Sequence, residues 1–155
     1  MGQNNPVYVD VFSNKQGLSN SSIEQIIEDK YGFIWLVTLN GLKRFDGKTF
    51  KTYHHINGDT TSIPTNVLYC GHIDKQDRLW IGIVNGIVLY NREKDNFKYF
   101  GFFIKRSHIN GASVMLSITN DSKGNVWFCS KKGICVYDVS NQTFDWSLSD
   151  KFRLS

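Results

Sequence analysis

Short apolar runs alternate with short polar segments along the whole chain. The run 33–37 is rich in β-branched and aromatic residues, and it follows a polar segment at 29–32 that ends in Gly. A second apolar run, 42–45, follows an Asn-Gly pair at 40–41. Runs of this length, bounded by turn residues, predict β-strands, and Asn-Gly pairs favour tight hairpins. We therefore predict neighbouring strands that pair antiparallel. The spacing of the Ile residues in 23–27 also fits a helical period, but this run is too short for a stable helix.

The same pattern occurs three times in register. An Asp stands six residues before a Trp in each copy, with a Gly six residues after the Trp and an aromatic residue ten after it. The three pairs are Asp29 and Trp35, Asp74 and Trp80, and Asp121 and Trp127. The Trp residues are 45 and 47 residues apart. A fixed period in this range predicts a repeat architecture.

These repeats predict an all-β fold built from β-propeller blades. We predict three four-stranded antiparallel meanders at about 23–53, 67–100 and 114–147, and an extra outer strand at 7–12. Propellers close with about four to eight blades, so residues 1–155 together predict an open, partial propeller.

Burial predicts where the repeated Trp residues lie. A small sheet that is apolar on both faces is soluble only when neighbouring sheets cover those faces. A large ring on the second strand of each blade suits the space between blades. We therefore interpret Trp35, Trp80 and Trp127 as the structural core of the repeat, rather than as platforms for stacking sugars.

Composition excludes several classes of function. The 155 residues carry a formal net charge of +4, spread along the chain, whereas a nucleic-acid interface needs a clustered basic patch. No apolar run approaches the ~18 residues that a membrane-spanning helix requires. The N-terminus lacks the charged and then apolar pattern of a signal peptide.

The spacing of the three cysteines favours buried structural thiols over metal-binding or redox-active ones. The spacing of Cys70, Cys129 and Cys135 fits neither a zinc site nor a CxxC redox motif, which favours thiols packed in an apolar core. Cys129 and Cys135 flank a predicted turn, and the sequence leaves open whether they pair across it.

We expect no catalytic residue, no metal and no cofactor. The recurring Asp29, Asp74 and Asp121 allow two interpretations, a ring of carboxylates for a metal or turn-forming residues, and their place at the start of each connection favours turns. The four His residues show no metal-binding spacing. No acid, base and nucleophile converge, so an enzyme such as a lyase is disfavoured.

The motifs resemble a known family. The segments Gly-Leu-Ser-Asn at 17–20, the Asp-to-Trp stretch at 29–35, Asn-Gly-Leu at 40–42 and Phe-Asp-Gly at 45–47 are similar to the two-component regulator propeller repeat. The resemblance covers about residues 7–147. Asp77 departs from the pattern, because it stands where the repeat has a turn Gly.

The resemblance implies a sensor. The family fills the periplasmic sensor region of hybrid two-component systems in Bacteroides-type bacteria, whose parent proteins continue into a membrane helix, a histidine kinase and a response regulator. It implies that this chain is a periplasmic, non-catalytic fragment of a region that detects glycans and regulates the transcription of polysaccharide utilisation genes. The alternative is a propeller scaffold for protein–protein assembly that binds no small molecule.

We expect binding residues on one face of the blades. Loops between the second and third strands, and between blades, meet there on a rigid scaffold. Side-chain amides and ammonium groups suit sugar hydroxyls and acidic sugars. The candidates are Asn20, Asn40, Asn66, Asn85, Lys131 and Lys132. Turn geometry is the competing explanation for Asn40 and Asn85.

Open blade faces also predict association. Three blades leave two apolar faces without a neighbour, which favours self-association, for example two copies in a six-bladed ring.

Overall fold

The computed structural model describes residues 22–101 and 113–145, and these residues form three four-stranded antiparallel sheets. The predicted all-β fold of open propeller blades is confirmed. The run 7–12, which we predicted as an outer strand, lies outside the described residues, as do 146 and 147.

Each sheet is one blade whose strands follow in chain order. Blade 1 contains β1 (Ile23–Glu28), β2 (Ile34–Thr38), β3 (Gly41–Phe45) and β4 (Phe50–Tyr53). Blade 2 contains β5 (Cys70–Ile73), β6 (Leu79–Ile83), β7 (Gly86–Asn91) and β8 (Asn96–Gly101). Blade 3 contains β9 (Met115–Asn120), β10 (Val126–Ser130), β11 (Gly133–Asp138) and β12 (Thr143–Asp145).

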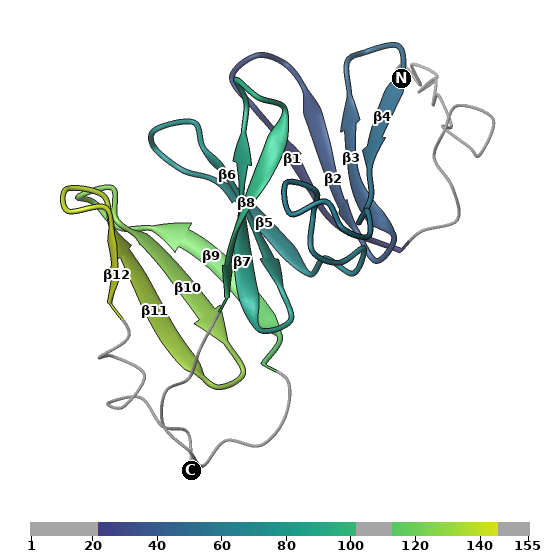
Figure 1. Ribbon diagram of the computed structural model, residues 1–155. Helices are drawn as coiled ribbons and strands as arrows, with labels where there is room; N and C mark the ends of the chain where they lie inside the picture. Colours follow the sequence, from purple (N-terminus) through teal and green to yellow (C-terminus); the bar gives the residue numbers. More distant parts are fainter. Residues whose placement is uncertain (1–21, 102–112, 146–155) are drawn as a thin grey trace, which may run out of the picture.

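The three blades stand side by side in chain order (Figure 1). Their first strands, β1, β5 and β9, lie next to one another, while β4 and β12 lie at the two sides of the fan. The hairpins β2–β3, β6–β7 and β10–β11 each turn at the lower end of their blade in Figure 1, and residues 66–68, which lead from blade 1 to blade 2, are hydrogen-bonded at this end. We call this end the linker face.

Hydrogen bonds join each linker to a hairpin of the linker face. The Leu68 amide donates to the Thr38 carbonyl over 3.1 Å, and the Asn85 amide donates to the Ser113 carbonyl over 2.8 Å. β5 begins at Cys70 and not at 67 as predicted, and the bond from Leu68 shows that the chain before it is still joined to blade 1.

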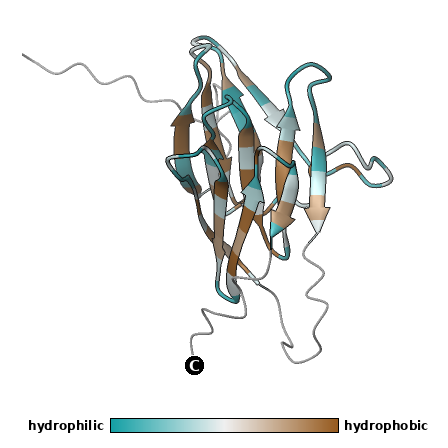
Figure 2. Cartoon of the chain, turned by 90° about the vertical axis from the view of Figure 1, so that its left-hand side faces the viewer, coloured by the Kyte–Doolittle hydropathy of each residue, from teal (hydrophilic) through white to brown (hydrophobic). Residues whose placement is uncertain are grey.

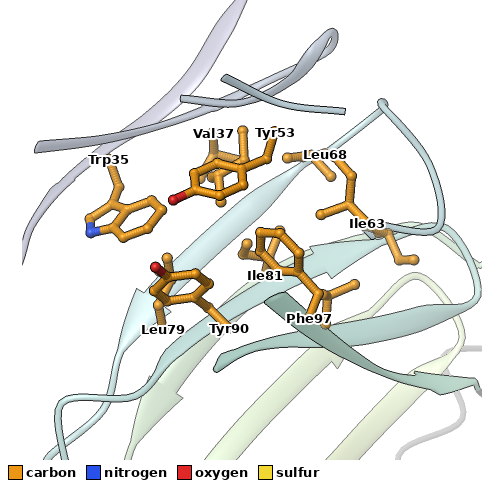
Figure 3. Packing of buried hydrophobic residues seen from close by; sticks show 12 residues of the cluster. Trp35, Val37, Tyr53, Ile63, Leu68, Leu79, Ile81, Tyr90 and Phe97 are labelled. Carbon is orange, nitrogen blue, oxygen red and sulfur yellow. The ribbon is translucent and has the colours of Figure 1, made fainter. Parts of the chain in front are cut away.

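Apolar side chains fill both spaces between blades, and hydrophobic residues line the strands (Figure 2). Trp35 and Tyr53 of blade 1 meet Tyr90 and Phe97 of blade 2, and the Trp35 and Tyr90 rings lie 4.8 Å apart (Figure 3). Trp80 takes the corresponding place between blades 2 and 3, against Phe128, Tyr137 and Phe144. Trp35 and Trp80 are fully buried, whereas Trp127 is half-buried on the far side of blade 3.

A glycine makes close packing possible in both spaces. A Cβ on Gly71 would lie 2.7 Å from Ile27 Cδ1 and 2.9 Å from Val37 Cγ2, so the side chains of blade 1 fill the place of its missing side chain. A Cβ on Gly82 would lie 2.4 Å from Met115 Cγ, so the same holds between blades 2 and 3. All three distances are shorter than real carbon contacts, so neither position admits a larger residue without movement.

We expect Gly71→Ala to destabilise the chain by about 1–3 kcal/mol, because the new methyl overpacks the space between blades 1 and 2. Urea denaturation would measure the free energy of unfolding. Adding Val37→Ala removes one of the two methyl groups that the new side chain meets, so the double variant should lose less stability than the two single variants together. Simple additivity would show that the contact with Val37 does not contribute to the loss.

Candidate functional site

The β1–β2 connection is a turn built around the Asp29 side chain. Asp29 Oδ1 accepts hydrogen bonds from the backbone amides of Tyr31 and Phe33 at 3.0 and 3.1 Å. Its Oδ2 accepts from Trp35 Nε1 at 2.9 Å. The backbone closes through a bond from the Gly32 amide to the Asp29 carbonyl at 2.9 Å. One carboxylate thus holds both the turn and the indole that fills the space between blades.

The other two copies repeat this arrangement, which we call the Asp turn. Trp80 Nε1 donates to Asp74 Oδ2 at 2.7 Å, and Trp127 Nε1 donates to Asp121 Oδ2 at 3.1 Å. The left-handed position is Gly32 in the first turn (φ 81°), Asp77 in the second (φ 58°) and Gly124 in the third (φ 90°). Asp77 therefore adopts the conformation that the repeat normally assigns to Gly, and Asp tolerates it better than most residues.

Guanidinium groups neutralise the two fully buried carboxylates. Arg92 of the β7–β8 turn donates to Asp29 Oδ2 across the blade boundary at 2.6 Å, and Arg78 Nε donates to Asp74 Oδ2 at 2.6 Å. Burial raises the pKa of Asp29, but hydrogen bonds from Trp35, Arg92 and the turn backbone outweigh it, so this pKa lies below its usual value.

These contacts favour the turn-forming interpretation of the repeated Asp residues. The carboxylate oxygens of Asp29 and Asp74 are occupied by donors of the chain itself. Within residues 22–101 and 113–145, no three His, Cys, Asp or Glu side chains are grouped closely enough to hold a metal ion.

A second polar cluster, which we call the Asp95 node, joins blades 1 and 2 at their outer strands. Asp95 Oδ1 accepts from the hydroxyls of Tyr53 and Tyr90 at 2.6 and 2.5 Å, and Lys51 pairs with Oδ2. Arg44 lies 3.8 Å from the same carboxylate. Burial raises the pKa of Asp95, but the bonds from Lys51 and the two hydroxyls outweigh it and lower the pKa to about 2.

Neither Asp95 nor Arg92 was predicted from the sequence. Their place in the short connection between β7 and β8 is their only local signal. Arg92 binds Asp29 of blade 1, and Asp95 binds Tyr53 and Lys51 of blade 1 besides Tyr90 of its own blade, so the sequence of one repeat does not reveal these contacts.

The linker face holds the predicted Asn residues in different roles. Asn66 accepts from the His55 amide through Oδ1 at 2.7 Å, and its carbonyl accepts from the Gly41 amide at 2.7 Å. Asn85 has φ 58°, and its Oδ1 accepts from the Ser113 amide at 2.7 Å. Both residues therefore fix linkers. Asn40 is exposed and has an ordinary backbone, because Gly41 (φ 91°) carries the left-handed position instead.

The predicted Lys residues lie on the β10–β11 hairpin of the same face. The Lys131 amide donates to the Val114 carbonyl at 3.1 Å, and its side chain is exposed. Lys132 is half-buried, and its amide donates to Ser130 Oγ at 3.2 Å. The structure thus places Asn40, Asn66, Asn85 and both Lys residues on one face, while Asn20 lies outside the described residues. Their role in binding stays a prediction.

The cysteines do not form a disulfide. Cys129 is exposed, whereas Cys135 is buried between blades 2 and 3. Cys129 pairs with Ile134 across the hairpin, and Cys135 pairs with Phe128, so the two thiols belong to opposite faces of the sheet. The prediction of core thiols is right for Cys70 and Cys135 and wrong for Cys129, because the far face of blade 3 carries no further blade among the described residues. Burial raises the pKa of Cys70 to about 12.

Comparison with known proteins agrees with the repeat geometry. Residues 17–40 match the family described as two component regulator propeller. The chain carries a two-component regulator propeller repeat. A relative, Histidine kinase P4 of Formosa agariphila, is 44% identical over 61 residues, which are 39% of this chain and 4% of that protein.

A solved structure resembles nearly the whole described fold. It is the extracellular domain of a putative hybrid two component system from B. thetaiotaomicron, with 30% sequence identity and a TM-score of 0.74. The match covers 88% of this chain and 19% of that one, so the propeller repeats seen here span about a fifth of that domain. The chain is homologous to the extracellular domain of that system. No helix among the described residues is long and apolar enough to cross a membrane.

We expect Asp74→Asn to lower the free energy of unfolding by about 3–5 kcal/mol, because it leaves the Arg78 guanidinium half-buried without its carboxylate and weakens the bond from Trp80. Asp121→Asn is the matched control. Its carboxylate takes part in the same turn but is paired with Asn125 rather than a cation, so a loss of about 1 kcal/mol is expected. Urea denaturation of both variants makes the comparison, and equal losses would contradict it.

Acid should weaken the Asp95 node between blades 1 and 2. The folded pKa of Asp95 lies below its ordinary value of 3.8, so its stabilisation is present above about pH 4 and is lost as the pH falls towards about 2. Asp95→Asn should therefore be less stable than the unchanged chain at pH 7, with a difference that shrinks below pH 4. Thermal melts from pH 2 to pH 7 would measure this, and a difference independent of pH would exclude the carboxylate as the cause.

Proposed function

We propose that this chain is part of the periplasmic sensor region of a hybrid two-component system, and that this region detects an oligosaccharide. The observation that carries the proposal is the similarity to an extracellular domain of such a system, at 30% identity over 88% of the chain. The similarity to a histidine kinase supports the same assignment. In this proposal the chain has no catalytic role, and a kinase elsewhere in the parent protein passes the signal to genes for polysaccharide utilisation.

The linker face supports a recognition role. It gathers three hairpins and the connection between blades 1 and 2 on a scaffold whose interior is closely packed. The exposed residues Asn40 and Lys131 lie on two of these hairpins. An amide group donates to and accepts from sugar hydroxyls, and an ammonium group pairs with an acidic sugar.

Calorimetry on the extracellular region that contains this chain would test the proposal against a panel of neutral and acidic oligosaccharides. We expect at least one of them to bind. Asn40→Ala or Lys131→Ala should weaken that binding about fivefold, the equivalent of one net hydrogen bond of about 1 kcal/mol. Lys94→Ala is the matched control, because Lys94 is also exposed but lies on the β7–β8 turn at the opposite end of the blade.

Two results would contradict the proposal. Absence of binding across the panel would favour a scaffold for protein–protein assembly. Turnover of an oligosaccharide would indicate an enzyme.

A further inference from the structure

The Tyr99 ring lies against the surface of blade 2 at the linker face. Gly86 of β7 and Gly101 of β8 are register partners, and Tyr99 stands two residues before Gly101 on the same side of the sheet. A Cβ on Gly86 would lie 2.4 Å from Tyr99 Cε2, and one on Gly101 would lie 3.3 Å from Cε1. The ring therefore covers both glycines. A side chain at Gly86 would collide with it, and one at Gly101 would require it to move by a few tenths of an ångström.

The other side of the Tyr99 ring is open. Tyr99 is 46% exposed although the glycine pair covers one side of it. Its hydroxyl donates to the Asn85 carbonyl at 3.2 Å, which fixes the ring orientation. The result is a flat aromatic surface that is held in place before any ligand arrives.

An amide donor stands beside this ring. Asn85 Oδ1 accepts the Ser113 amide, which fixes the side chain and leaves the Nδ2 group as the donor end of an exposed residue. The sequence left turn geometry and ligand binding open as roles of Asn85. The structure shows that the backbone at φ 58° and the Oδ1 atom serve the turn and the linker, so the Nδ2 group is the part available to a ligand.

A second ring lies over a glycine of blade 1. A Cβ on Gly41 would lie 3.0 Å from His54 Nδ1, so the imidazole covers this glycine from one side. His54 is exposed and lies beside the Asn40 hairpin. Its register differs from that of Tyr99, because His54 follows Tyr53, the partner of Leu42, whereas Tyr99 pairs with Val88, two residues after Gly86. Two successive blades thus each present a ring and an adjacent Asn at the linker face, in different registers.

The need to cover the glycines explains why one side of each ring is packed against the sheet. It does not explain why the exposed side is a flat aromatic face. An aliphatic side chain would also shield the glycine backbone from water. It would not provide a flat face, and it has no hydroxyl to fix its orientation as Tyr99 has. A flat aromatic face beside an amide donor suits a sugar ring, whose C–H face packs on the aromatic surface while its hydroxyls accept from the amide.

We propose that Tyr99 and Asn85 form a stacking subsite for one sugar unit of an oligosaccharide, and that His54 and Asn40 form a second subsite on blade 1. The proposal rests on the proposed function and names where on this chain the ligand is held. A chain of sugar units is the ligand class that meets both subsites, because they lie on neighbouring blades of one face.

The test compares three substitutions in the extracellular region that contains this chain. Tyr99→Leu keeps an apolar cover over Gly86 but removes the flat ring, so the affinity for the oligosaccharide that binds best in the panel should fall about tenfold. Tyr99→Phe keeps the ring, so its affinity should stay within about threefold of the unchanged protein. Tyr31→Leu is the matched control, because Tyr31 is 56% exposed on the Asp turn at the opposite end of blade 1. Calorimetry gives the affinities, and thermal melts show whether each variant is folded.

Saturation-transfer NMR on the unchanged protein tests the contact without a substitution. The expected result is transfer from aromatic protons to the C–H protons of one sugar face, and its loss in Tyr99→Leu. Unchanged binding and transfer in folded Tyr99→Leu would overturn the subsite and leave the sensing function in place. Absence of binding by every oligosaccharide would overturn both proposals.

Discussion

The buried hydrogen bonds from Trp35 to Asp29 and from Trp80 to Asp74 connect the local turns to the packing between blades. The carboxylate needs the turn amides because it is buried, and the indole N–H needs the carboxylate because the ring is surrounded by apolar groups. A substitution at either residue therefore changes a turn and a blade interface together. This coupling explains why the spacing of six residues between Asp and Trp is the same in all three repeats while the residues between them differ.

The two described interfaces solve the same packing problem in opposite ways. Val37 of blade 1 projects into the place left by Gly71 of blade 2, whereas Gly82 of blade 2 leaves a place for Met115 of blade 3. Each interface therefore contains one glycine, on alternating sides. Polar contacts add direction to the stack, since Lys30 of the first Asp turn pairs with Asp77 of the second, and Lys75 of the second donates to the Asp121 carbonyl of the third at 2.9 Å. Packing and polar contacts together specify which face of a blade meets which face of the next.

The fold was predictable from sequence because its signals are local. The Asp-to-Trp spacing, the Asn-Gly pairs and the apolar runs are read within one repeat, and they predict the strands, the turns and the burial of Trp35 and Trp80 correctly. Trp127 is half-buried, because no described blade covers its side of blade 3. The contacts between repeats were not predictable, because Arg92 reaches Asp29 over 63 residues and Asp95 binds the hydroxyl of Tyr53 over 42. The same limit applies to the candidate site. In the sequence, nothing distinguishes the roles of Asn66 and Asn85 from that of Asn40. In the folded chain, the amide oxygens of Asn66 and Asn85 accept hydrogen bonds from residues of the linkers. The rings of His54 and Tyr99 were not predicted either, because each lies over a glycine that belongs to another strand.

The rule of one glycine per interface also bears on how the open faces are covered. The outer face of blade 3 carries Cys129 at the position of Val37 and Gly82, and the outer face of blade 1 carries Ile26 at the position of Gly71. Two copies joined through these faces in the same geometry would place Cys129 against Ile26, with no glycine on either side, and overpacking of this kind is destabilising. Blade 3 also has Ser122 where the first two Asp turns have Lys30 and Lys75, so the lysine contact to a following turn would be lost. A neighbour that matches blade 3 therefore needs a glycine in its first strand, as blade 2 has at Gly71, and self-association into a six-bladed ring would require a shift from the packing seen between the described blades.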